Sequence, residues 1–148
     1  MLKIVPPVWF ISFLLLGLAV HFLVPTARVF HFALPWLGAL LFVASFGFTL
    51  YASSLFKKEN TEILPTSPTN RVLITYGPYK FTRNPMYLGM VGTLLGVGLM
   101  VGTLPAYLIA LAQFLVLNFV HIPFEEAKLV RIFGEQYLAY KKKVRRWI

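Results

Sequence analysis

The feature that most constrains this 148-residue chain is a set of apolar runs, each close to the length of a membrane-spanning helix. A helix crosses the hydrocarbon core of a bilayer with about 20 mostly apolar residues. Hydrophobic residues make up 58% of the chain and charged residues 13%, whereas charged residues are about a quarter of a soluble domain. The sequence therefore predicts one all-α, polytopic membrane domain with four transmembrane helices, over residues 8–24, 32–56, 86–101 and 104–121.

The third and fourth runs are separated by a short turn that contains Gly102, Thr103 and Pro105. So short a connection predicts an antiparallel hairpin. The third run is brief, so either it crosses with little tilt or the pair only dips into the bilayer. Glycines recur along it, and small residues at such spacing favour close packing between membrane helices; they are Gly89, Gly92, Gly96 and Gly98.

The basic residues predict the orientation. With four spans, Lys3, the segment between the second and third spans, and the segment after the fourth lie on one side, and together they hold every lysine and arginine except Arg28. Cytoplasmic loops carry such an excess, so both termini are expected in the cytoplasm, with the protein in the plasma (inner) membrane. The net charge of +9 is then expected to meet anionic lipid rather than nucleic acid.

The stretch from Gly77 to Gly89 stands where a polar segment meets the third apolar run. Gly-Pro marks a turn, and Pro85 suits the first position of a helix. Asn84 before it is a natural N-cap, so Arg83 and Asn84 would lie beside exposed helix amides, which bind anions. Tyr79 and Tyr87 either belong to the aromatic belt of the interface or form the wall of a site.

Residues 124–144 predict a C-terminal amphipathic cytoplasmic helix, with Pro123 ending or kinking the fourth span. Glu126 falls on the same face as Leu129, Phe133 and Tyr137 and therefore points inward. A buried carboxylate needs a partner. Either Glu126 forms a structural ion pair with Arg83 or Lys80, or it binds a ligand, and the spacing leaves both readings open.

These segments resemble a known family. The motifs are Gly77-Pro78-Tyr79, the run from Thr82 to Gly89, the apolar hairpin, Glu125-Glu126-x-x-Leu129, and Phe133-Gly134-Glu135-x-Tyr137-x-x-Tyr140. In order and spacing, across about residues 55–146, they are similar to the integral-membrane methyltransferases, which include isoprenylcysteine carboxyl methyltransferases and phospholipid methyltransferases. One departure is Asn84, which stands where the prenylcysteine enzymes have a histidine, and this disfavours a prenylcysteine carboxylate as the acceptor.

The resemblance implies a cytoplasmic pocket for S-adenosylmethionine and a lipid or hydrophobic small-molecule acceptor that enters from the bilayer. It implies Arg83 and Glu126 as catalytic residues and no metal. A proton from an amine or thiol acceptor would pass to His121 or Glu125. The implied cofactor-binding residues are Tyr79, Arg83, Asn84, Tyr87 and Leu88 on one side, with Glu125, Glu126 and Tyr137 on the other.

Two other functions remain open at this stage. One is a non-enzymatic helical scaffold or lipid-binding protein, in which Arg83 and Glu126 form only a salt bridge. The other is a membrane reductase similar to the sterol reductases, although so short a chain leaves little room for a dinucleotide. Four small apolar spans also allow a homodimer.

Overall fold

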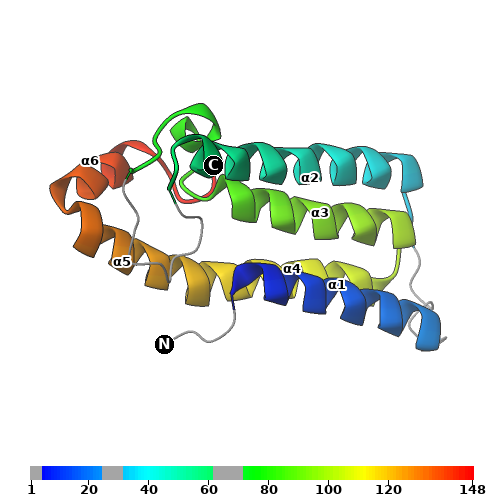
Figure 1. The fold of residues 1–148 in the computed structure, drawn as a ribbon. Helices are drawn as coiled ribbons and strands as arrows, with labels where there is room; N and C mark the ends of the chain where they lie inside the picture. The colour runs from blue at the N-terminus through cyan, green and yellow to red at the C-terminus, as the bar shows by residue number, and fades with distance from the viewer. Residues whose placement is uncertain (1–4, 25–31, 62–71) are drawn as a thin grey trace.

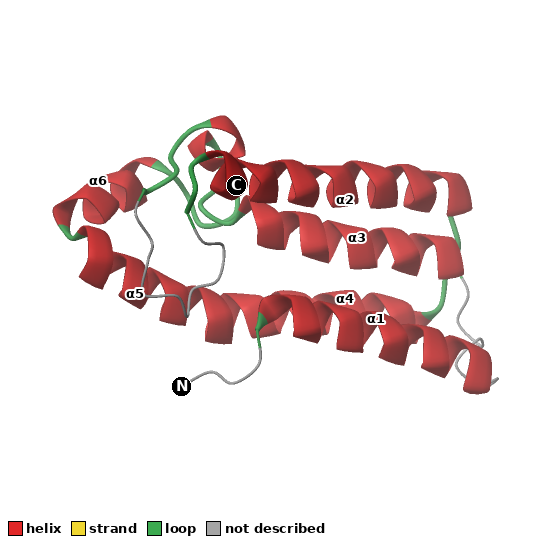
Figure 2. Cartoon of the chain, in the orientation of Figure 1, coloured by secondary structure: helices red, strands yellow, loops and turns green. Residues whose placement is uncertain are grey.

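The computed structural model describes residues 5–24, 32–61 and 72–148. Within these ranges the framework is helical, without an extended strand (Figure 2), which confirms the all-α prediction. The helices are α1 (Pro6–Leu23), α2 (Pro35–Lys58), α3 (Pro85–Val101), α4 (Leu104–Val116), α5 (Ile122–Phe133) and α6 (Glu135–Lys143). Four charged residues of the segments expected on one side of the membrane or the other fall outside the described residues: Lys3, Arg28, Glu62 and Arg71.

Helices α1 to α4 run alongside one another in alternating directions (Figure 1). The expected hairpin is present, because α3 and α4 are joined by Gly102 and Thr103 alone. Helices α2 and α3 approach closely through glycines. A Cβ atom at Gly96 would lie 2.7 Å from the backbone nitrogen of Phe42 and 2.9 Å from the carbonyl oxygen of Gly38. The glycine spacing of α3 thus serves close helix packing.

Three helices of the described residues are long and apolar enough to cross a membrane: α1, α2 and the continuous helix Leu104–Phe133. Helix α3 is apolar but has 17 residues. At about 1.5 Å per residue it is about 25 Å long, slightly less than the hydrocarbon thickness of about 30 Å. This protein is therefore an integral membrane protein, and a fourth span remains a prediction.

Pro123 does not end the helix that begins at Leu104. A π-helical turn, Leu117–His121, joins α4 to α5. A proline ring clashes with the carbonyl group four residues before it, here that of Phe119, and this carbonyl belongs to the wider π turn. The whole helix of 30 residues is about 45 Å long, and its charged residues occur from Glu125 onwards. Since charges are costly in hydrocarbon, α5 is the part that extends beyond the membrane.

The prediction of one amphipathic helix over residues 124–144 is wrong, because Gly134 divides it into α5 and α6. The backbone of Gly134 has φ 50° and ψ −127°, a conformation that residues with a Cβ rarely adopt. After this break α6 turns back toward the ends of α2 and α3 (Figure 1). The chain therefore forms a hook at one end of the helical bundle, and every lysine and arginine of the described residues lies at that end.

Candidate functional site

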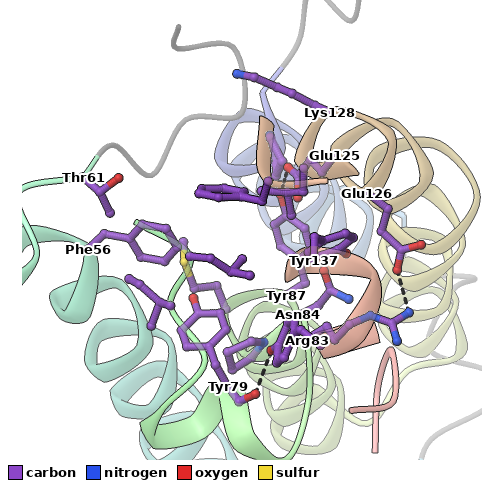
Figure 3. Close-up of a pocket in the computed structure, with 18 of the residues that line it drawn as sticks. Phe56, Thr61, Tyr79, Arg83, Asn84, Tyr87, Glu125, Glu126, Lys128 and Tyr137 are labelled. Atoms are coloured by element: carbon purple, nitrogen blue, oxygen red, sulfur yellow. Dashed lines mark hydrogen bonds and ion pairs between the residues drawn. The ribbon is translucent and has the colours of Figure 1, made fainter. Parts of the chain in front are cut away.

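A pocket opens between the hook and the near end of the bundle. Its empty volume, open solvent at the mouth included, is about 1060 Å³. Apolar side chains from the starts of α1 and α3 and the end of α2 form one part of the wall, and polar groups from residues 79–87 and from α5 form another (Figure 3). The lining includes seven of the eight residues expected at the site: Tyr79, Arg83, Asn84, Tyr87, Glu125, Glu126 and Tyr137. Leu88 is half-buried and does not line the pocket.

The segment before α3 is held by its neighbours on both sides. Gly77 begins a short 3₁₀ turn, Gly77–Lys80, with φ 61°. The ring of Tyr79 lies edge-on to Phe56 of α2, with 5.8 Å between ring centroids. The hydroxyl of Tyr140 in α6 donates a hydrogen bond of 2.7 Å to the carbonyl oxygen of Tyr79. Burial raises the pKa of both tyrosines, so their hydroxyls stay protonated at neutral pH.

Arg83 connects this segment to α5 and to the chain after α6. Its Nη2 donates to Oε1 of Glu126 at 2.7 Å, and its Nη1 donates to the carbonyl oxygens of Lys141 and Val144 at 3.0 and 2.5 Å. Its backbone nitrogen donates to the carbonyl oxygen of Arg145 at 3.0 Å. The Nε atom of Arg83 is buried and has no hydrogen-bond partner among the described residues. Arg83 thus holds the loop before α3 to α5 and to residues 141–145.

Glu126 is a buried carboxylate surrounded by cations. Besides Arg83, it accepts bonds from Lys141 at 2.8 Å and Arg146 at 3.3 Å. Burial alone would raise the pKa of Glu126, but the hydrogen bonds from Lys141, Arg83 and Arg146 outweigh it and lower the pKa to about 2. The ion pair of Glu126 with Arg83, which the sequence left open, is thus present. The contacts of Lys141 and Arg146 were missed, because both residues read as ordinary cytoplasmic charges.

Glu125, the next residue, has a different environment. It accepts a hydrogen bond from the hydroxyl of Tyr87 in α3. Burial raises the pKa of Glu125 to about 7, although the bond from Tyr87 and the charge of Lys128 act in the opposite direction. The two adjacent carboxyl groups thus differ in pKa. Glu126 is ionised and bound by cations, while Glu125, at the wall of the pocket, has a pKa near neutral pH.

Asn84 and Tyr137 complete the polar wall. Asn84 precedes α3, as expected of an N-cap, but its side chain makes no capping bond. Its Nδ2 donates instead to the carbonyl oxygen of Arg146 at 3.0 Å. Tyr137 is almost fully buried, and burial together with the nearby carboxylate of Glu126 raises its pKa to about 12. His121 is buried in the π turn and does not line the pocket.

Three comparisons bear on this site. A model of the family described as phospholipid methyltransferase matches residues 33–136. An uncharacterized protein of Haemophilus influenzae is 41% identical over 63 residues, which are 43% of this chain and the whole of that protein.

The fold also matches a solved structure, that of the eukaryotic intramembrane Ras methyltransferase, isoprenylcysteine carboxyl methyltransferase. The TM-score is 0.67 with 22% sequence identity, and the match covers 96% of this chain and 51% of that one. The chain therefore spans about half the length of that structure and shares its fold.

Proposed function

This chain belongs to the phospholipid methyltransferase family, and from this premise and the pocket we propose that it transfers a methyl group from S-adenosylmethionine to a lipid or other hydrophobic acceptor at the cytoplasmic membrane face. The observation that carries the proposal is the pair of unequal carboxylates at the pocket wall. Glu126 is neutralised by cations, and Glu125 beside it faces the pocket with Tyr87.

The residues present fit this cofactor. S-adenosylmethionine supplies a methyl group bound to a positively charged sulfur, together with a carboxylate, an amine and ribose hydroxyls. The positive charge of Arg83, which lines the pocket, suits the carboxylate. The carboxylate of Glu125 and the tyrosine rings suit the cationic groups. The pocket is lined mostly by apolar side chains with a few polar groups, as is usual for the site of a small organic ligand.

In this proposal the protein mainly positions the reactants and excludes water. Methyl transfer is an in-line displacement, which depends on orientation and on a dry, shaped site. An amine or thiol acceptor must also lose a proton. Glu125, with a pKa of about 7, is suited to accept it at a carboxylate oxygen, whereas Glu126, with a pKa of about 2, is not. Since His121 does not line the pocket, Glu125 is the better candidate of the two.

The end of the bundle that holds the pocket also bears on the class of methyl acceptor and on the orientation of the protein in the membrane. Apolar residues of the pocket lining suit a lipid acceptor: Pro6, Pro7, Phe56, Met86 and Met90. The lysines and arginines of the described residues gather at this end, which favours the cytoplasmic side by the positive-inside rule. We propose four spans, with α3 as the third, both termini in the cytoplasm, and anionic lipid near the basic end.

The test is calorimetric titration of S-adenosylhomocysteine into detergent-purified protein, with Glu125→Gln and Glu135→Gln alongside. Glu135 is an exposed acid of α6 and serves as the matched control. Saturable binding that Glu125→Gln weakens and Glu135→Gln leaves unchanged supports the proposal. Folded wild-type protein that gives no heat, in detergent and again in lipid nanodiscs, would instead favour the scaffold or lipid-binding reading, in which the ion pair of Arg83 and Glu126 is structural.

A further inference from the structure

The segment after α6, residues 144–148, does not line the pocket, yet it contacts residues that do. The carbonyl oxygen of Arg146 accepts hydrogen bonds from Oγ1 of Thr82 and Nδ2 of Asn84, both at 3.0 Å. The carbonyl oxygens of Val144 and Arg145 accept bonds from Nη1 and the backbone nitrogen of Arg83. The chain before α3 is thus bound through three consecutive carbonyl groups.

The side chains of the same segment reach the opposite wall. Arg146 donates to Oε2 of Glu126 at 3.3 Å, and its Nη1 lies 3.5 Å from both the carbonyl and the side-chain oxygen of Asn118. The indole nitrogen of Trp147 donates to Oδ1 of Asn118 at 2.9 Å. The Trp147 ring lies 5.0 Å from that of Phe114, centroid to centroid. Asn118 belongs to the π turn, so this segment bridges the loop before α3 and the α4–α5 helix.

We propose that Arg146 and Trp147 are positioning residues of the cofactor pocket, which fix the distance between the Arg83–Asn84 loop and the Glu125–Glu126 turn of α5. This inference rests on the proposed function. Neither residue lines the pocket. Each acts through its partners: Arg146 through Thr82, Asn84 and Glu126, and Trp147 through Asn118.

The hydrogen bonds to residues 144–146 explain two features of the loop before α3 that are not needed to start that helix. Asn84 stands at the N-cap position but gives its amide to Arg146 instead of to the helix. Arg83 directs Nη1 and its backbone nitrogen to carbonyls of residues 141–145, while its Nη2 binds Glu126. If the segment were absent, Asn84 would lose the partner of its amide, and Arg83 would keep only its bonds to Glu126 and to the carbonyl oxygen of Lys141. Both side chains would then be held less firmly.

The bundle itself does not depend on these contacts for its main interface. The glycines of α3 pack against α2 at Gly38, Phe42 and Ser45, away from the segment. A change in residues 144–148 is therefore expected to loosen the pocket more than the fold.

The experiment measures the dissociation constant for S-adenosylhomocysteine by calorimetry and the unfolding temperature of the ligand-free protein, for wild type and a set of variants. The variants are a deletion of residues 144–148, Arg146→Gln, Arg146→Lys, Trp147→Phe and, as a control at the far end of the bundle, Tyr107→Phe. Each titration is made well below the unfolding temperature of the variant, so that the measured constant refers to folded protein.

We expect the deletion and Arg146→Gln to weaken binding by about tenfold or more, the equivalent of one or two lost charge-assisted hydrogen bonds. Arg146→Lys keeps the charge beside Glu126 and should restore part of the affinity. Trp147→Phe keeps the ring but loses the bond to Asn118, and it should weaken binding less. Tyr107→Phe should leave the constant unchanged. If the deletion variant does not fold, the dissociation constants of Arg146→Gln and Trp147→Phe test the inference instead.

Variants that unfold at lower temperature but bind with the wild-type constant would overturn the inference, because residues 144–148 would then be purely structural, and the proposed function would stand. Folded wild-type protein that does not bind would overturn the proposed function, and the positioning role with it.

Discussion

Arg83 and Glu126 are 43 residues apart in the chain, yet Nη2 of one lies 2.7 Å from Oε1 of the other, with 8% and 7% of their side-chain surfaces exposed. The pair joins the loop before α3 directly to α5, and both residues line the pocket. Exchanging the two charges, Arg83→Glu with Glu126→Arg, does not test whether the pair is structural. An arginine at position 126 would face Lys141 and Arg146, so the exchange fails in either case.

Glu126→Gln should destabilise the protein strongly. It leaves the buried guanidinium of Arg83 without its countercharge, and breaking a buried pair from one side costs about 3–5 kcal/mol. We expect a lower midpoint of chemical unfolding in detergent. Glu135→Gln makes the same chemical change at an exposed position and should stay within about 0.5 kcal/mol of wild type. Equal midpoints for the two variants would contradict a structural role for the pair.

The stability should depend on pH in two separate windows. The pKa of Glu125 is raised from 4.5 to about 7, so the folded state holds its proton longer than the unfolded state, and this contribution to stability is lost as the pH rises from about 4.5 through 7. The pKa of Glu126 is lowered to about 2, so its contribution is lost as the pH falls from about 4.5 toward 2.

Glu125→Gln should remove the upper window and leave the lower one. The measurement is the difference in unfolding free energy between wild type and the variant at pH 5 and pH 8, which cancels the titration of the histidines. By the pKa shift the upper window amounts to about 3 kcal/mol at most. A difference that does not change with pH would show that Glu125 is not held protonated in the folded protein.

Tyr140→Phe should affect both stability and binding. It removes the bond to the carbonyl oxygen of Tyr79 and leaves that buried acceptor unsatisfied, at a cost of about 1–3 kcal/mol. Tyr107→Phe is the matched control, because the hydroxyl of Tyr107 donates at 2.6 Å to the carbonyl oxygen of Phe32 at the other end of the bundle. We expect both variants to unfold earlier, and Tyr140→Phe alone to weaken binding of S-adenosylhomocysteine.

Gly96→Ala should separate α2 from α3. The added methyl group would lie 2.7 Å from the backbone nitrogen of Phe42, too close without a shift of the helix, and overpacking of this kind costs about 1–3 kcal/mol. Gly47→Ala places the same group on an open face of α2, with no atom within 4 Å. It should be neutral or slightly stabilising, because alanine is the better helix former. Thermal unfolding of the two variants compares them directly.

The helical framework follows from the sequence with little ambiguity. Apolar runs of membrane length have few alternatives to helix, since lipid offers no partner for backbone groups. The turn at Gly102 and Thr103 fixes the hairpin, and Pro35 and Pro85 mark helix starts within a few residues of those predicted. These are local signals, and the structure follows them.

The sequence predicted which residues form the site better than it predicted the hydrogen bonds that they make. Seven of the eight expected residues line one pocket, but apart from Glu126 the partners of the Arg83 and Asn84 side chains are backbone carbonyls of residues 141–146. Carbonyl groups have no sequence signature, so no spacing rule could identify them. The break at Gly134 was missed for a related reason: the helical spacing of side chains continues past it, while the backbone does not.

The hydrogen bonds between Arg83 and residues 141–145 also bear on how the protein is made. The ribosome synthesises the chain from its amino terminus, so the N-terminal elements can fold first. Helices α2 and α3 can pair in the membrane while α6 has yet to be synthesised. The loop before α3 receives its carbonyl partners only when residues 141–146 have been synthesised, so the nascent protein can hold a bundle of spans before it has a finished pocket.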